Sequence, residues 1–119
     1  MDAELDVVNV IHIDDDKAVL DVTKRSLERE HPEMEVEGYL SPADALGNLE
    51  EADCIVTDYQ MEEMDGLEFL EVIRNDHPDV PVIFFTGRGS EEVAGEAFRL
   101  GVTDYLQKGS GTERYELLA

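Results

Sequence analysis

The stretch VVNVIHIDDD, residues 7–16, joins a run of mainly apolar residues to three consecutive aspartates. A short apolar run that stops abruptly at polar residues is typical of a buried strand. Three further runs of this kind follow at Cys54–Thr57, Val80–Phe85 and Tyr105–Gln107. The segments between the runs have helical periodicity, so strands and helices alternate along the chain. This alternation predicts a parallel sheet with helices on both of its faces.

Helix caps and helix-breaking residues locate the remaining elements. The alternating segment Met34–Tyr39 is expected to be an edge strand with one wet face. The first helix is expected to turn an apolar side made of Val19, Leu20, Val22 and Leu27 toward the sheet. The expected helices run from the cap Asp16 to about Glu30, from the cap Ser41 to about Glu50, from Asp65-Gly66 to His77, from Ser90 to Leu100 with Gly101 closing it, and onward from Ser110–Glu113.

Polar residues with complementary chemistry stand where the four apolar runs end. They are Asp14, Asp15, Asp58, Thr86 and Lys108. In open parallel sheets, ligands bind outside the carboxyl ends of the strands, where the strand order reverses. Carboxylates are good Mg²⁺ ligands, and crowding them together without a cation is costly. An aspartate can also attack phosphorus, while a lysine and a hydroxyl stabilise phosphoryl oxygens. The sequence therefore predicts a site for a divalent metal and a phosphoryl group.

Length and composition favour one compact domain. The chain has 119 residues, 42% of them hydrophobic, which is enough to bury a core without disulfides. The single cysteine, Cys54, lies in an apolar run, and we interpret it as a small core residue in a reducing, cytoplasmic setting. No apolar run is long enough to span a bilayer, so no membrane segment is predicted.

The charge balance is strongly acidic. Thirty acidic residues oppose nine basic ones, which gives a formal net charge of −21 and a sequence pI of about 4.1. Without a basic stripe to neutralise phosphates, direct binding of nucleic acid is not expected. A charge of this size repels itself unless salt screens it, so a halophilic source is predicted. An ordinary acidic domain with well-solvated helices is the alternative.

Four segments resemble the receiver domains of two-component response regulators. They are HIDDD (12–16), IVTDYQM (55–61) with MDG (64–66), FFTGR (84–88) and DYLQK (104–108). The resemblance covers essentially the whole chain in register. It implies a single CheY-like receiver domain over residues 1–119, with a flavodoxin-like, doubly wound sheet of five parallel strands in the order 2-1-3-4-5.

The same resemblance implies that Asp58 accepts a phosphoryl group from the phosphohistidine of a sensor kinase or phosphotransfer domain. Such a domain is a phosphoacceptor rather than an enzyme, although it assists its own phosphorylation and dephosphorylation. By this resemblance, Asp15 and Asp58 would bind Mg²⁺ directly, with Mn²⁺ as a substitute, together with the backbone carbonyl of Gln60. Asp14 would act mostly through water.

The resemblance also implies roles for residues around the phosphoryl group. Thr86 and Lys108 would contact that group, and Tyr105 would turn inward when Thr86 moves. This movement would switch the surface around the fourth helix and the fifth strand. Gln60 and Arg88 would flank the path of the attacking water. Arg88 is expected to shield the phosphoryl group, because a long cationic side chain can pair with its oxygens.

Some positions depart from the family pattern. Glu62 replaces the proline that commonly follows the methionine, and Gly109 replaces a proline usually joined to the lysine by a cis bond. Glycine has little reason to adopt a cis bond, so the turn after Lys108 must be built differently. The ending KGSGTE (108–113) resembles receiver modules of halophilic archaea. Because the sequence stops at Ala119 inside an apolar helical stretch, it is expected to continue into an output or kinase domain, with dimerisation on phosphorylation left open.

Other classes of function fit the sequence less well. A hydrolase that uses an aspartyl phosphate would need an acid–base carboxylate where Gln60 stands. The sequence contains no P-loop motif. Asp14 and Asp16 are not followed by the further ligands and the glycine that an EF-hand calcium loop needs. A pseudo-receiver that only binds partner proteins stays open. His12 is expected to be a core histidine rather than a metal ligand, and Met61 and Met64 are expected to pack a loop.

Overall fold

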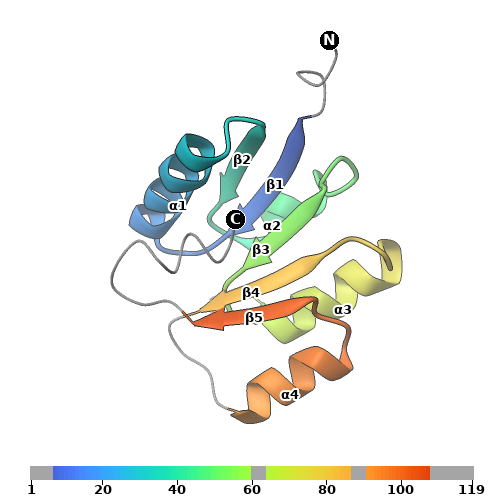
Figure 1. The fold of residues 1–119 in the computed structure, drawn as a ribbon. Helices are drawn as coiled ribbons and strands as arrows, with labels where there is room; N and C mark the ends of the chain where they lie inside the picture. The colour runs from blue at the N-terminus through green and yellow to red at the C-terminus, as the bar shows by residue number, and fades with distance from the viewer. Residues whose placement is uncertain (1–6, 60–63, 87–90, 108–119) are drawn as a thin grey trace.

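Five parallel strands form one sheet in the order β2-β1-β3-β4-β5 (Figure 1). The computed structural model describes residues 7–59, 64–86 and 91–107. The strands are β1 (Val8–Ile13), β2 (Met34–Tyr39), β3 (Cys54–Thr57), β4 (Val82–Thr86) and β5 (Asp104–Gln107). The described helices are α1 (Lys17–Glu30), α2 (Pro42–Leu46), α3 (Gly66–Asp76) and α4 (Glu91–Arg99). The expected strand order is confirmed, with β2 at one edge.

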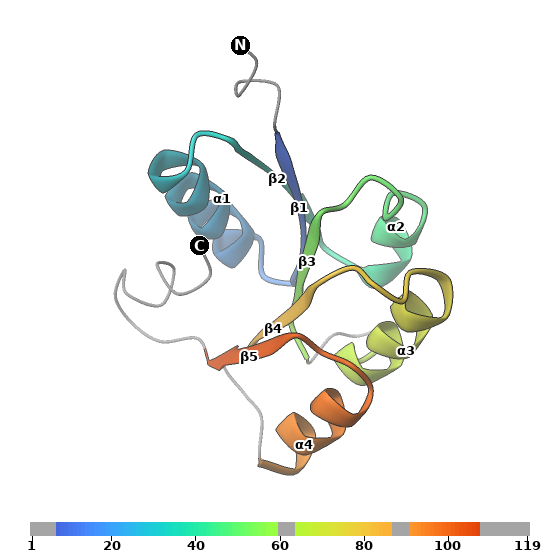
Figure 2. The ribbon, with the colours of Figure 1, turned by 45° about the vertical axis from the view of Figure 1, so that its right-hand side comes forward.

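Each central strand contributes to two separate hydrophobic clusters. Along β1, Ile11 and Ile13 belong to the larger cluster, whereas Val10 belongs to the smaller one. The larger cluster also takes residues from α2, α3 and α4, and the smaller one takes Leu27 from α1. Side chains alternate between the two faces of a strand, so the sheet divides the core into two layers. Figure 2 shows α1 on one side of the sheet and α2 and α3 on the other.

Local capping explains where the helices begin. The Asp16 side chain accepts a hydrogen bond from the Ala18 N–H at 2.9 Å and starts α1. At α3, Asp65 and Glu68 form a reciprocal capping box. Such caps bind N–H groups that have no partner within the helix. Both helix starts were predicted from the sequence and are confirmed.

The apolar side of α1 differs from the prediction. Val22 is 42% exposed, and Thr23 is buried in its place beside Leu20 and Leu27. The reason is helical geometry: Thr23 follows Leu20 by three residues and precedes Leu27 by four, so the three share one face. Val22 lies two residues from Leu20 and faces away from the sheet.

Two other boundaries need correction. Helix α2 ends at Leu46 rather than near Glu50, because the chain turns at Gly47 and then brings Leu49 into the core outside the helix. Strand β4 runs from Val82 to Thr86 rather than from Val80 to Phe85, since Pro81 has no N–H to offer the strand ladder. The helix predicted from Ser110–Glu113 lies outside the described residues.

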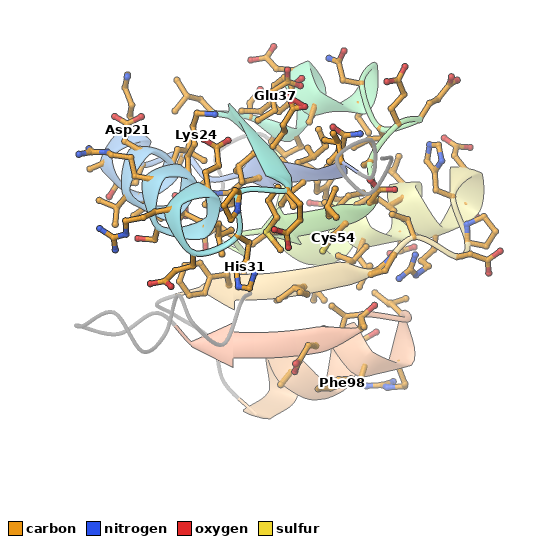
Figure 3. The ribbon with its side chains drawn as sticks, turned by 45° about the horizontal axis from the view of Figure 1, so that its top comes forward. Asp21, Lys24, His31, Glu37, Cys54 and Phe98 are labelled. Atoms are coloured by element: carbon orange, nitrogen blue, oxygen red, sulfur yellow. The ribbon has the colours of Figure 1, made fainter. Side chains whose placement is uncertain are left out.

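Cys54 was expected to be a small core residue, and it lies half-buried at the margin of the core. Its side chain, labelled in Figure 3, packs against the smaller hydrophobic cluster. Burial raises the pKa of the Cys54 thiol to about 11, and the nearby Asp53 adds to this effect. The thiol therefore stays protonated at neutral pH, as a structural cysteine does. Among the described helices, none combines the length and the apolar character needed to cross a membrane.

Candidate functional site

The carboxyl ends of β1 and β3 lie side by side and hold the aspartates in place. Ile13 pairs with Thr57 in the sheet, and the Asp58 N–H donates to the carbonyl of Ile13 at 3.0 Å. On the other side of β1, the Asp14 N–H donates to the carbonyl of Tyr39 at 3.1 Å. The backbone at Asp14 and Asp58 thus continues the sheet for one residue beyond each strand.

The three predicted acidic residues meet at this edge. Oxygen atoms of Asp14, Asp15 and Asp58 all lie within 4.8 Å of one another. Asp14 is fully buried and Asp58 is only 8% exposed, whereas Asp15 is open to solvent. Buried carboxylates so close together repel one another, and a cation relieves that repulsion.

Short-range hydrogen bonds orient the two buried carboxylates. Oδ1 of Asp14 accepts from the Asp16 N–H at 2.9 Å. Oδ1 of Asp58 accepts from the N–H of Tyr59 at 2.7 Å, and the Thr57 hydroxyl donates to the Asp58 carbonyl at 3.0 Å. The roles of Thr57 and Tyr59 were not predicted from the sequence. Both residues act through hydrogen bonds around Asp58 that depend on the path of the backbone.

The donor set fits Mg²⁺ or Mn²⁺. Mg²⁺ binds oxygen ligands in an octahedron, so two oxygens on one ion are separated by no more than about 4 Å. Carboxylates within 4.8 Å of one another need only a small approach to share an ion. One solvent-exposed ligand also suits an ion that keeps some of its water.

The other predicted site residues are placed only in part. Thr86 is the last residue of β4 and pairs with Gln107 of β5, so its backbone lies at the same edge of the sheet. Tyr105 lies in β5, paired with Phe84, and the structure describes its backbone only. The remaining predicted site residues, Gln60, Arg88 and Lys108, lie outside the described residues, as do Met61, Glu62 and Gly109.

His12 is a core residue, as expected. Its side chain is fully buried on β1, and the centre of its ring lies 6.5 Å from that of Phe85. Within the described part of the chain, the group of possible metal ligands contains the three aspartates and not His12. Met64, half-buried before α3, packs against the larger hydrophobic cluster, which agrees with its expected role in the loop.

Comparison with known proteins gives a consistent result. The family model for the response regulator receiver domain matches residues 10–118. The chain is 34% identical over 105 residues to the cyclic di-GMP phosphodiesterase response regulator RpfG of Xanthomonas campestris, covering 85% of this chain and 28% of that protein. It is also 34% identical over 102 residues to the DNA-binding transcriptional regulator NtrC of Proteus hauseri, covering 84% and 21%. The chain therefore spans a quarter or so of the length of these relatives.

Solved structures show the same architecture. A CheY-like receiver domain protein from Methanospirillum hungatei superposes with a TM-score of 0.83 at 29% identity, covering 94% of this chain and 88% of that one. The chemotaxis protein CheY4 of Vibrio cholerae superposes with a TM-score of 0.85 at 24% identity, covering 94% and 95%. The flavodoxin-like fold expected from the sequence is thus confirmed.

Proposed function

The chain belongs to the family of response regulator receiver domains, and on that premise we propose that Asp58 accepts a phosphoryl group from the phosphohistidine of a sensor kinase or phosphotransfer domain. The observation that supports this most directly is the meeting of Asp14, Asp15 and Asp58 at the carboxyl ends of β1 and β3. Asp58 stands at the centre of the sheet edge, between β1 and β4.

The chemistry is a transfer between two nucleophiles. One carboxylate oxygen of Asp58 forms a bond to phosphorus while the bond from phosphorus to the imidazole nitrogen breaks. The imidazole leaves with that electron pair, and the product is an aspartyl phosphate. The Tyr59 N–H donates to Oδ1 of Asp58 at 2.7 Å and so holds the carboxylate in one orientation for the attack on phosphorus.

Asp15, Asp58 and the carbonyl of Gln60 are proposed to hold Mg²⁺ or Mn²⁺, with Asp14 acting through water. The bound ion would supply positive charge beside the phosphoryl oxygens. Lys108 and the hydroxyl of Thr86 are proposed to add a cation and a hydrogen-bond donor. Gln60 and Arg88 are proposed to set the lifetime of the phosphorylated state.

Phosphorylation is proposed to change the surface around α4 and β5, through the movements of Thr86 and Tyr105. The domain spans residues 1–119 in this proposal and belongs to a longer cytoplasmic protein with an output or kinase module, which the 28% and 21% coverage of the two named relatives supports. The named relatives include a phosphodiesterase and a DNA-binding regulator, so the output cannot be carried over from either. Dimerisation on phosphorylation belongs to the same proposal. So do the absence of direct nucleic-acid binding and a halophilic source, both because of the net charge of −21, and an archaeal origin, because of the resemblance of residues 108–113.

The test is labelling by a small phosphodonor such as acetyl phosphate in the presence of Mg²⁺. Base-labile phosphate should appear in the wild-type domain and be absent from Asp58→Asn. Asp53→Asn is the matched control, because Asp53 directly precedes β3 just as Asp58 directly follows it. Undiminished labelling of Asp58→Asn would remove the assignment. An unlabelled wild-type domain would favour a pseudo-receiver that only binds partners.

A further inference from the structure

Helix α3 begins in direct contact with the peptide that follows Asp58. The Gly66 N–H donates to the carbonyl of Tyr59 at 2.7 Å. A Cβ atom built on Gly66 would lie 2.8 Å from the carbonyl oxygen of Asp58 and 2.9 Å from the Cα of Tyr59. Both distances are shorter than real Cβ contacts, so only glycine allows this approach. Among the described glycines, the backbone of Gly101 alone has a positive φ, so space rather than conformation selects glycine at Gly66.

The surroundings of Gly66 have little freedom to move. The two closest neighbours are backbone atoms, and the next is the Cζ of Phe84 at 3.1 Å, on a ring that is fully buried. On the helix side, the Asp65–Glu68 capping box fixes the first turn of α3 through bonds of 2.9 and 3.2 Å. An added methyl group would therefore displace either the Asp58–Tyr59 peptide or the start of α3.

That peptide also aims the carboxylate of Asp58. Its N–H, which belongs to Tyr59, binds Oδ1 of Asp58 at 2.7 Å, and its carbonyl accepts from the Thr57 hydroxyl at 3.0 Å. A shift of the peptide would turn the Asp58 carboxylate relative to Asp14 and Asp15, whose oxygens lie within 4.8 Å of it. Gly66 is thus linked to the acidic cluster by a continuous path of contacts.

We propose that Gly66 is a positioning residue that holds the Asp58 carboxylate in register with Asp14 and Asp15, which rests on the proposed function of that site. The start of α3 packs against the backbone of Asp58 and Tyr59, and the Tyr59 N–H links this contact to the carboxylate oxygen of Asp58. Loss of the constraint weakens cation binding first, because a metal site needs all its ligands aimed at one point.

The experiment measures binding of Mn²⁺ alone to Gly66→Ala, by titration followed by electron paramagnetic resonance. The dissociation constant is expected to rise about tenfold, as for changes that misalign metal ligands. Two controls should bind Mn²⁺ like the wild type. Gly95→Ala changes a helical glycine with open space around it, and Ile73→Val weakens the core of the same helix without approaching Asp58.

The Mn²⁺ titrations have clear outcomes for the proposed role of Gly66. Unchanged Mn²⁺ affinity in Gly66→Ala overturns the proposal, and so does an equal loss in Ile73→Val, which would indicate general loosening. If Gly66→Ala does not fold, Phe84→Leu replaces it, because the Phe84 Cζ lies 3.1 Å from the position of a Gly66 Cβ and a shorter side chain leaves the start of α3 room to shift. Unchanged affinity there would overturn the proposal as well. A wild-type domain that binds Mn²⁺ but resists labelling would count against the phosphoacceptor role alone.

Discussion

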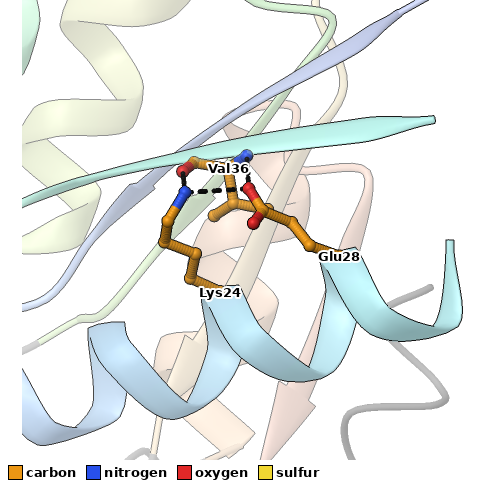
Figure 4. A network of polar contacts seen from close by, with 3 residues as sticks. All are labelled: Lys24, Glu28 and Val36. Carbon is orange, nitrogen blue, oxygen red and sulfur yellow. Dashed lines mark hydrogen bonds and ion pairs between the residues drawn. The ribbon is translucent and has the colours of Figure 1, made fainter. Parts of the chain in front are cut away.

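Glu28 of α1 accepts a hydrogen bond from the backbone N–H of Val36, in the edge strand β2, at 2.9 Å (Figure 4). The Lys24 ammonium completes the arrangement by donating to the Val36 carbonyl at 2.9 Å and to Glu28 at 2.8 Å. The two backbone groups of Val36 point away from β1 and would otherwise face an added strand. The ion pair therefore closes the outer edge of the sheet at this residue.

Replacement of Glu28 by alanine should open that edge. The Val36 amide is expected to exchange its hydrogen about tenfold faster or more, and the protein should self-associate as its concentration rises. Hydrogen exchange followed by NMR and sedimentation velocity measure the two effects. Asp21→Ala is the control, because Asp21 forms the equivalent i,i+4 pair with Lys17 on the same helix at 3.6 Å. Unaltered exchange at Val36 would contradict the edge-closing role.

The same carboxylate should make stability depend on acidity. The hydrogen bond from Lys24, and after it the one from Val36, holds the pKa of Glu28 below its ordinary value of 4.5. A lowered pKa in the folded state stabilises the protein above the ordinary pKa, and this contribution is lost as the pH falls through the lower value. The stability difference between wild type and Glu28→Gln, from urea unfolding, should be largest near neutral pH and shrink below about pH 4. A difference that stays constant down to pH 3 would argue against this ion pair.

Replacing Thr23 by valine should stabilise the protein. Its side chain is fully buried on α1, and its hydroxyl has no hydrogen-bond partner among the described residues. Valine has nearly the same shape without the polar atom, so Thr23→Val should raise the free energy of unfolding by about 1 kcal/mol. Thr103→Val is the contrasting variant, because the Thr103 hydroxyl accepts from the Val82 N–H at 3.0 Å and its loss should destabilise. Urea unfolding of both variants compares the two signs.

Arg74 should be among the more costly polar residues to remove. Its guanidinium donates to the carbonyl of Gly101 at 2.7 and 2.9 Å, to that of Val80 at 2.7 Å and to that of His77 at 3.1 Å. Three carbonyls lose a charged donor in Arg74→Met, so the expected cost is about 2–3 kcal/mol. Arg99→Ala, which removes an exposed ion pair with Glu96, should cost less than about 1 kcal/mol. Thermal and urea unfolding rank the two, and equal losses would contradict the role of Arg74.

Arg88→Ala should shorten the lifetime of the phosphorylated domain. The expectation comes from the resemblance to receiver domains, in which the residue two positions after the threonine flanks the path of the attacking water. Here that residue is Arg88, and a long cation can cover phosphoryl oxygens against water. Decay of the phosphorylated protein in Mg²⁺, with wild type beside variant, measures it. Equal or slower decay in the variant would leave Arg88 as a surface cation.

Sequence patterns predicted those features that depend on neighbouring residues. Asp16 and Ser41 were recognised as caps because a cap acts within three residues of itself. Asp14 and Asp58 were placed together because parallel strands share a carboxyl edge. The contact of Gly66 with Asp58 was not predicted, since it depends on how closely α3 approaches the backbone that follows β3. The pairing of Glu28 with Val36 was missed for the same reason, because it joins a helix to a strand edge. The early end of α2 was missed because Leu49 continues the apolar spacing after the helix has stopped.

The unequal burial of the three aspartates bears on how fast an ion exchanges. Asp15 is open to solvent, whereas Asp14 and Asp58 are buried. A hydrated cation would meet Asp15 first and would then exchange water for an oxygen of Asp58, with Asp14 acting through water as proposed above. Within the described part of the chain, no helix or strand has to move for an ion to reach Asp15, where this exchange would begin. Its rate should therefore follow the dehydration rate of the ion, with Mn²⁺ entering faster than the reluctantly dehydrating Mg²⁺.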